Sequence, residues 1–170
     1  LWVTVHSDDD GAEKIWLEDI QVPRERVIRI PTSDNFWQMG ETGPCGPCSE
    51  IHLDRGPAAC DRLGVAGHVC AVNGECARYI ELWNLVFIQY NRLSATELEP
   101  LPATHVDTGM GLERIVSVLQ DVNSNYKTDL LSPMMDAIQR LTGHTDEQRD
   151  ADITPYRVIT DHARTASFLI

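Results

Sequence analysis

The fold is decided by residues 106–115, Val-Asp-Thr-Gly-Met-Gly-Leu-Glu-Arg-Ile. The first half of this stretch has the pattern of the end of a buried strand that carries one carboxylate, Asp107. Gly109 and Gly111 let the backbone turn tightly and let a ligand come close to it. From Leu112 onward, apolar residues recur at helical spacing. The stretch therefore predicts a junction in which a strand, a glycine turn and a helix follow one another.

Two charged residues, Glu113 and Arg114, fall in the first turn of the predicted helix. An arginine at this place can form two parallel hydrogen bonds with phosphate or carboxylate oxygens, which a lysine cannot do. The alternative is a plain glycine turn with an ion pair on the surface. The rest of the chain has to decide between an anion site and such a turn.

Composition excludes several classes of protein. The 170 residues are 42% hydrophobic and 24% charged, so the chain is neither disordered nor a membrane span. A net charge of -12 argues against a general binder of DNA or RNA, because phosphates attract basic surfaces. The N-terminal residues do not resemble a signal peptide, which favours the cytoplasm. Because the chain starts without Met and ends abruptly, we expect it to be part of a longer protein.

Periodicity predicts the elements. Alternating patterns indicate strands over residues 1–6, 26–30, 36–39, 49–54, 78–92 and 104–110. Helical patterns indicate helices over residues 12–20, 112–122, 128–141 and 157–170. We expect irregular segments at residues 40–47, 55–77, 94–102 and 143–154. In the first helix, we expect Ile15, Trp16 and Ile20 to belong to the core.

Two predicted strands carry polar residues. Glu50, His52 and Asp54 alternate with apolar residues, which indicates either an anion or metal site or simply a half-exposed strand. Glu81 and Asn84 lie in a long aromatic-rich strand, on opposite faces by strict alternation. Burying them is costly unless they have partners. A magnesium-bound nucleotide and a small polar substrate would be suitable partners.

The five cysteines suggest two kinds of site. Cys45 and Cys48 enclose Gly-Pro, as in a thioredoxin active site, but that chemistry needs the first cysteine at a helix N-terminus. Here an alternating strand follows instead. Within the irregular segment 55–77, four residues could form a closed zinc site or remain unliganded: Cys60, His68, Cys70 and Cys76.

Several motifs, taken together and in order, resemble the alanyl-tRNA synthetase family of class II aminoacyl-tRNA synthetases. They are residues 34–40 (Asp-Asn-Phe-Trp-Gln-Met-Gly), 43–51 (Gly-Pro-Cys-Gly-Pro-Cys-Ser-Glu-Ile), 81–87 (Glu-Leu-Trp-Asn-Leu-Val-Phe), 106–115, 123–126 (Asn-Ser-Asn-Tyr) and 161–164 (Asp-His-Ala-Arg). The resemblance covers nearly the whole chain apart from the cysteine-bearing insertion at 55–77. It implies an α+β fold with an antiparallel sheet flanked by helices. Residues 1–154 would be the latter part of the catalytic domain, and residues 155–170 would begin the helical tRNA-recognition region.

The resemblance also implies a reaction and its participants. L-alanine would react with ATP, in the presence of Mg²⁺, to give alanyl-adenylate, and the alanyl group would then pass to the 3′ end of tRNA(Ala). The catalytic residues would be Arg114, Asp107 and Glu81. The alanine site would consist of Trp37, Asn84, Val86, Asp107 and Gly109. ATP would contact Arg114, Glu81, Glu50 and Gly111, with Mg²⁺ on Glu81, and Arg164 would contact tRNA.

The sequence departs from the family pattern in one respect, because class II motifs 1 and 2 are absent. We therefore expect this stretch alone to be catalytically incomplete. Two other hypotheses remain: a non-catalytic binding module derived from a synthetase, and a thiol oxidoreductase that uses Cys45 and Cys48. No pattern indicates an oligomeric state.

Overall fold

The computed structural model describes residues 1–170, apart from the side chains of residues 32 and 33. The chain divides into two compact units, residues 1–111 and 112–170, which are described one at a time. The functional boundary expected near residue 154 does not coincide with this division, and it stays a prediction. Among the described residues, no helix combines the length and the hydrophobicity needed to span a membrane.

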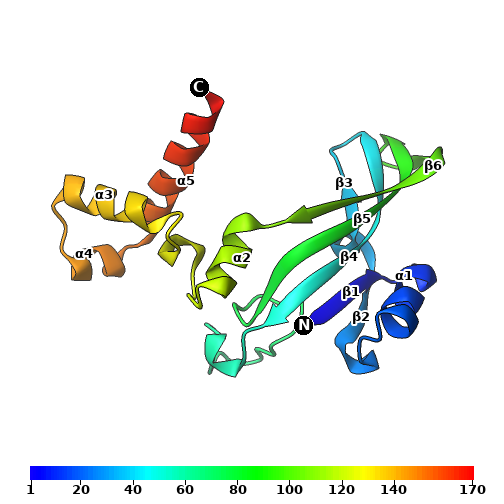
Figure 1. The fold of residues 1–170 in the computed structure, drawn as a ribbon, viewed down its shortest axis with the longest axis horizontal. Coiled ribbons are helices and arrows are strands. Elements are labelled where there is room, and N and C mark those ends of the chain that lie inside the picture. The colour runs from blue at the N-terminus through cyan, green and yellow to red at the C-terminus, as the bar shows by residue number, and fades with distance from the viewer. The chain divides into compact units, whose positions relative to one another are not determined.

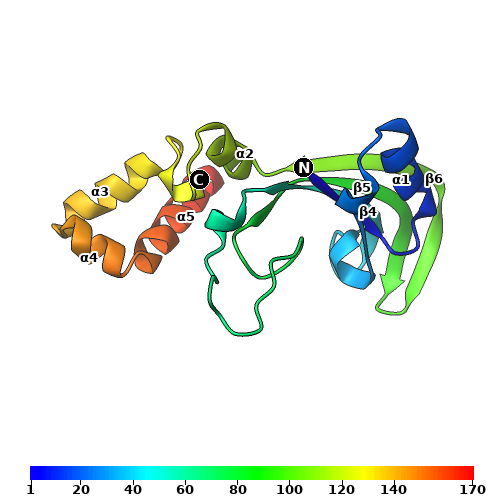
Figure 2. The same ribbon diagram turned by 90° about the horizontal axis from the view of Figure 1, so that it is seen from below.

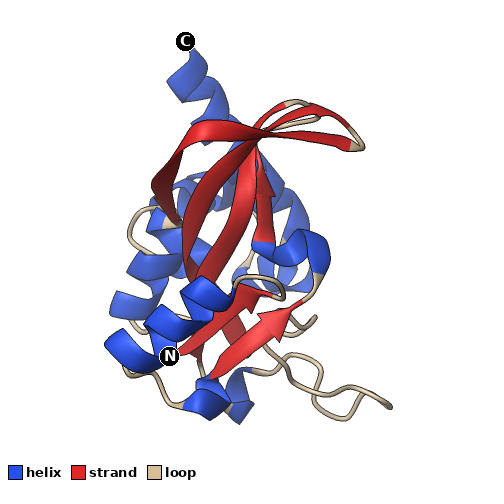
Figure 3. Ribbon diagram, turned by 90° about the vertical axis from the view of Figure 1, so that its right-hand side faces the viewer, coloured by secondary structure: helices blue, strands red, loops and turns tan.

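The first unit is built on a six-stranded sheet with the order β2-β1-β4-β5-β6, and β3 pairs with β4 beside this path (Figure 1). The strands are β1 Trp2–His6, β2 Val27–Ile30, β3 Phe36–Gln38, β4 Gly43–Asp54, β5 Tyr79–Ser94 and β6 Glu97–Met110. The α+β prediction is confirmed, since helices accompany this sheet in the same chain. Figure 3 shows the twist of the strands, which L-amino acids impose on a sheet.

One strand pair corrects the expectation of a purely antiparallel sheet. β1 and β2 run parallel, whereas every other strand pair in the described part of the chain is antiparallel. The helical segment between them explains this, because a crossover returns the chain to the start of the neighbouring strand. The sheet is therefore mixed.

The crossover helix begins as α1, Asp10–Lys14, with the Asp9 carboxylate accepting from the Ala12 amide at 2.9 Å. It continues as a π-helix over Ile15–Asp19. Trp16 packs against the core, as expected, but Ile15 and Ile20 are 52% and 58% exposed. Their expected burial is wrong because the wider π-helical turn changes which residues share a face.

The core of the first unit lies between this crossover and the sheet. Its buried members are Val3, Val5, Ala12 and Val27, with Trp16, Leu17, Val22 and Phe87 packed against them. Burial of alternate residues of β1 against the helix is the pattern that the strand periodicity predicts.

Residues 43–47, which we expected to be irregular, form the first part of β4. β4 pairs with β3 on one side and with β5 on the other, so its Gly-Pro content does not prevent pairing. Gly46 is required there: a Cβ at this position would lie 1.9 Å from the Phe87 carbonyl oxygen. Glycine, which is rare inside strands, marks a close approach of two backbones.

β6 also begins earlier than expected, at Glu97 rather than near residue 104. It follows β5 after a short turn, and the two strands curve together in Figure 2. Pro100 and Pro102 are compatible with β6 because it is the last strand of the sheet, where amides that face away from β5 have no strand to pair with.

The second unit is helical. Its helices are α2 Leu112–Leu119, α3 Ser132–Thr142, α4 Asp146–Ala151 and α5 Thr154–Leu169. Gly143 ends α3 in the left-handed conformation with φ 69°, as its position in the sequence predicts. The expected linker at 143–154 contains α4 instead, because Thr145 and Gln148 form a capping box.

Candidate functional site

The central feature of the first unit is a small pocket on the β5–β6 pair. Asn84 lies opposite Gly109, and Val86 lies opposite Asp107. Opposed residues on antiparallel strands direct their side chains to the same face, so these four positions form one floor. Trp37 of β3 and Thr108 complete the lining of a cavity of about 220 Å³. The five residues predicted for alanine binding thus lie together.

The size of this pocket restricts its ligands. Pockets for drug-sized molecules typically measure about 300–1,000 Å³, so a cavity of 220 Å³ suits a smaller ligand. An acceptor carboxylate, an amide and an apolar wall around such a space are the groups that recognise a small zwitterion.

Asp107 stands on an exposed strand, which corrects the expectation of a buried one. β6 is an edge strand, and Val106 beside Asp107 is 69% exposed. Asp107 Oδ1 accepts a hydrogen bond of 2.8 Å from the Thr108 amide. This bond orients the carboxylate at the pocket wall.

A buried carboxylate, Glu50, lies beside the pocket, on β4 directly opposite Asn84. It is 6% exposed, and His52 next to it is 1% exposed, so the hypothesis of a half-exposed strand is wrong. Glu50 Oε2 lies within 3.2 Å of Thr4 Oγ1, His52 Nε2 and Asn73 Nδ2. Burial alone would raise the pKa of Glu50, but the hydrogen bonds from His52 and Asn73 lower it below its usual value. The network therefore favours a charged carboxylate inside the protein.

Glu50 also contacts the pocket itself. Its Oε1 accepts a hydrogen bond of 3.5 Å from Asn84 Nδ2. The Asn84 Oδ1 atom is buried and has no hydrogen-bond partner among the described residues. Because buried polar atoms are nearly always paired in native proteins, this oxygen is a candidate acceptor for a ligand.

A larger cavity of about 580 Å³ adjoins the pocket and shares Trp37 and Asn84 with it. Its other lining residues are His6, Asp34, Phe36, Gln38, Cys48, Arg92 and Leu98. None of the four residues predicted to contact ATP lines this cavity. Sequence reasoning did not select Arg92, because a charged residue near the end of a long strand is common and gave no signal.

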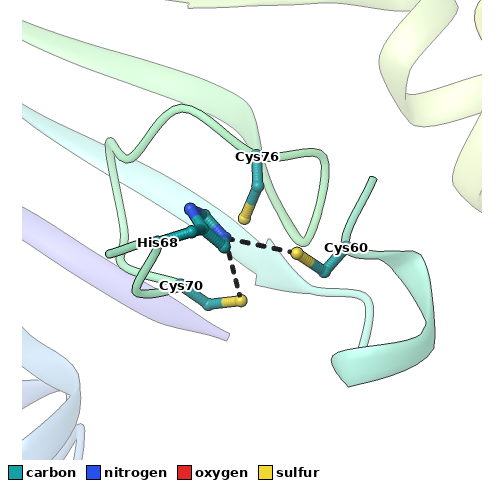
Figure 4. Close-up of side chains that lie close together, drawn as sticks. All are labelled: Cys60, His68, Cys70 and Cys76. Atoms are coloured by element: carbon teal, nitrogen blue, oxygen red, sulfur yellow. Dashed lines mark hydrogen bonds between the residues drawn. The ribbon is translucent and has the colours of Figure 1, made fainter. Parts of the chain in front are cut away.

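The insertion at 55–77 brings four metal-ligand side chains together. The ligand atoms of Cys60, His68, Cys70 and Cys76 all lie within 4.8 Å of one another (Figure 4). His68 Nε2 is 3.3 Å from Cys60 Sγ and 3.6 Å from Cys70 Sγ. In a tetrahedral zinc site with Zn–S bonds of about 2.3 Å, ligand sulfurs lie about 3.8 Å apart. Three thiols and an imidazole at this spacing fit zinc.

Glu81 and Gly111 lie close to the end of β6, where Met110 is paired with Trp83 of β5. Glu81 is opposite His52, because a register shift in β5 inserts one extra residue between the pairs Trp83–Ile51 and Glu81–His52. Strict alternation, used to predict the faces of β5, does not hold across this shift. The Gly111 amide donates to the Leu82 carbonyl at 3.3 Å and so continues the β5–β6 pairing beyond Met110.

The two predicted arginines both lie in the second unit. Arg114 is exposed in the first turn of α2, as the sequence predicts. Arg164 of α5 forms an ion pair with Glu113 and stacks 5.9 Å from the ring centre of Phe168. The Arg164 guanidinium lowers the pKa of Glu113. The predicted contact of Arg164 with tRNA would either form beside the Arg164–Glu113 ion pair or replace it.

A family model described as tRNA synthetases class II (A) matches residues 1–170. The chain belongs to this family. Among curated proteins, the alanine–tRNA ligases of Nitrosomonas europaea, Nitrosospira multiformis and Nitrosomonas eutropha are 52%, 51% and 50% identical to it over 170 residues. The matches cover all of the chain but 19% of each relative.

The positions of Cys45 and Cys48 bear on the thiol hypothesis. Cys45 and Cys48 are 0% and 2% exposed and lie inside β4, not at a helix N-terminus. Burial, followed by the nearby Glu50 carboxylate, raises the pKa of the Cys48 thiol to about 12. A thiol of this kind does not form the reactive thiolate that an oxidoreductase requires. The structure therefore contradicts the oxidoreductase alternative.

Sequence reasoning missed two residues of the candidate site. Thr4 and Asn73 reach Glu50 from segments 46 residues before and 23 residues after it. No local pattern marks either residue. The one signal was the unexplained polarity of Glu50 and His52 within a strand.

Proposed function

We propose that the protein containing this chain activates L-alanine with ATP and transfers the alanyl group to the 3′ end of tRNA(Ala). The observation that carries the proposal is the pocket of Trp37, Asn84, Val86, Asp107 and Gly109, found in a chain half identical to alanine–tRNA ligases. The relatives are about five times longer than this chain, so the activity belongs to the whole protein. The same proposal includes a cytoplasmic location and excludes membranes and DNA as binding partners.

The pocket supports recognition of alanine by complementary groups. Asp107 would accept hydrogen bonds from the alanine ammonium, and Asn84 Oδ1 would supply a second acceptor. Val86 and Trp37 would contact the methyl group, while Gly109 would leave room only for a small side chain. Such a pocket excludes large amino acids by size but discriminates weakly against glycine and serine.

ATP would meet residues outside this pocket. In the first step, an alanine carboxylate oxygen attacks the α-phosphorus of ATP, and pyrophosphate leaves. Arg114 would hold the phosphates through its planar guanidinium, and Gly111 and Glu50 would support the nucleotide site. Mg²⁺, held by Glu81, would supply charge neutralisation of the polyphosphate when bound. No side-chain nucleophile is required, because positioning and electrostatics carry the reaction.

The proposal also includes a structural zinc ion in the insertion. The donor set of Cys60, His68, Cys70 and Cys76 would bind one Zn²⁺ and hold the insertion in a single conformation. Arg164 and the start of the helical region would contribute to tRNA recognition, and its pair with Glu113 sets its orientation before tRNA arrives.

The experiment is ATP–pyrophosphate exchange on the full-length protein, with each of the twenty amino acids in turn. We expect exchange with alanine, weaker exchange with glycine and serine, and its loss in Asp107→Asn. Asp136→Asn is the matched control: Asp136 lies on α3 in the second unit and should leave exchange unchanged. Absence of exchange with any amino acid would contradict the proposal and favour a non-catalytic module.

A further inference from the structure

The cysteine-bearing insertion reaches back to the polar network of Glu50 beside the pocket. Asn73, near the C-terminal end of the insertion, donates from Nδ2 to Glu50 Oε2 at 3.2 Å. Glu50 accepts from Asn84 Nδ2 through its other oxygen, at 3.5 Å. A continuous path of hydrogen bonds therefore runs from the insertion to a residue that lines the pocket.

The conformation of the insertion explains why Asn73 can make this contact. The Gly74 amide donates to the Ala71 carbonyl at 3.0 Å, which closes a tight turn. Asn73 occupies the third position of this turn with φ 56°, a left-handed conformation that asparagine tolerates. Val72, 9% exposed, anchors the turn against the protein.

The metal-ligand cluster encloses this turn. Cys70 lies three residues before Asn73, and Cys76 lies three residues after it. Both sulfurs belong to the group of four ligand atoms that converge within 4.8 Å. A metal bound there would hold the two ends of the segment and so restrict where Asn73 can lie.

The side-chain amide of Asn84 has a donor, Nδ2, and an acceptor, Oδ1, and its orientation decides which of them faces the pocket. Glu50 can only accept hydrogen bonds when it is ionised, so it selects the orientation with Asn84 Nδ2 toward it. Asn84 Oδ1 is then the atom left without a partner in the described part of the chain. If Glu50 turned away, the amide could rotate and present donors to the ligand instead of an acceptor.

We propose that Asn73 and Glu50 are positioning residues that orient Asn84 for alanine, and that metal binding by the insertion keeps Asn73 in place. This inference rests on the proposed function. It assigns the insertion a role in alanine affinity, in addition to holding its own fold.

The test uses the full-length protein and measures alanine binding by calorimetry, without ATP. Asn73→Gly removes the amide but suits the left-handed turn, so it should fold. We expect the Kd for alanine to rise about five- to tenfold, as expected for the loss of one hydrogen bond in a coupled network. Glu75→Ala, on the same segment, removes only an exposed ion pair with Arg62 and should leave the Kd unchanged.

Exchange kinetics supply a second readout that a general loss of stability would not produce. In Asn73→Gly, the KM for alanine should rise by the same factor as the Kd, while kcat and the KM for ATP stay within about twofold. Zinc content, measured by atomic emission, should equal that of the wild type, because all four ligands remain.

Metal removal tests the second half of the inference. Zinc is stripped with a chelator, the chelator is removed, and alanine binding is measured again. The wild type should lose affinity by the factor seen in Asn73→Gly, and stripped Asn73→Gly should lose nothing further, since both changes act through one contact.

Each outcome has a distinct meaning. An unchanged Kd in Asn73→Gly overturns the positioning role. A weaker Kd in Asn73→Gly with no effect of zinc removal on the wild type overturns the link to the metal. Failure of the wild type to bind alanine at all overturns the proposed function itself, and this inference with it.

Discussion

Arg78 holds Asp54 through two parallel hydrogen bonds, Nε to Oδ1 and Nη2 to Oδ2, each 2.7 Å long. Asp54 is the last residue of β4, and Arg78 directly precedes β5. The pair therefore closes the base of the insertion where the chain leaves and re-enters the sheet. The Arg78 guanidinium lowers the pKa of Asp54 to about 2.

Replacement of Arg78 by lysine should lower the Tm of the protein by a few degrees, because lysine cannot form the paired bonds. The measurement is thermal unfolding followed by circular dichroism. Arg62→Lys is the matched control in the same insertion, since its partner Glu75 is exposed and such pairs contribute little. Equal shifts in Tm for the two variants would show that the Arg78–Asp54 pair stabilises the protein no more than the exposed pair does.

The same pair predicts a dependence of stability on pH. The folded-state pKa of Asp54 is depressed, so its contribution is fully present above its ordinary pKa of about 4. It is lost as the pH falls from about 4 towards 2, because the unfolded state then binds the proton first. The free energy of unfolding, measured in urea between pH 5 and 2, should fall less steeply with decreasing pH for Arg78→Lys than for the wild type.

Gly46→Ala should destabilise the first unit by about 2–4 kcal/mol, the range of severe overpacking between backbones. The added Cβ would lie 1.9 Å from the Phe87 carbonyl oxygen, and a backbone atom cannot move aside as a side chain can. Gly40→Ala is the control, because the nearest atom to its Cβ would be 3.9 Å away. Equilibrium unfolding in urea measures both; similar midpoints would contradict the close approach of β4 and β5.

Gly109→Ala should separate stability from function. Its Cβ would meet no atom within 4 Å, so the free energy of unfolding should change by no more than about 0.5 kcal/mol. The new methyl group would stand beside Asn84 on the pocket floor. We expect the KM for alanine to rise about tenfold or more with little change in the KM for ATP. Normal alanine kinetics would remove Gly109 from the proposed site.

Alkylation should distinguish the two groups of cysteines. Iodoacetamide at pH 8 should leave Cys45 and Cys48 unmodified in the folded protein, because both are buried and the pKa of Cys48 is raised to about 12. Cys70, the most exposed cysteine of the proposed zinc site, should react once the protein has been treated with a chelator. Peptide mass spectrometry identifies the modified residues, and a sample in urea shows that all five can react. Rapid modification of Cys48 in the folded protein would restore the oxidoreductase hypothesis.

Much of the candidate site could be predicted because its residues lie in continuous motifs. Asp107 and Gly109 share one motif, and Asn84 and Val86 share another, so the resemblance alone selects them. Residue spacing does not report how two distant strands align. The register that places Asn84 opposite Gly109 depends on hydrogen bonds between β5 and β6 and on the irregularity between Ile88 and Tyr90.

The errors also have physical causes. The Gly-Pro segment before Cys48 has low intrinsic strand propensity, yet it forms a strand because β3 and β5 pair with it on both sides. Ile15 and Ile20 followed the helical period of 3.6, which the π-helix does not keep. Pro100 and Pro102 suggested a turn, but an edge strand accommodates them.

By itself, the sequence predicted most of the strands and helices, the end of α3 at Gly143, the four cysteine and histidine residues that the insertion brings together and the residues of the proposed alanine pocket. These features depend on interactions within a few residues or on continuous motifs, which a sequence displays directly. Only the tertiary structure decided the parallel β1–β2 pair, the exposed position of Asp107 and the path from Asn73 through Glu50 to Asn84. Such contacts join residues far apart in the chain, and their free energy exists only once the sheet has brought them together.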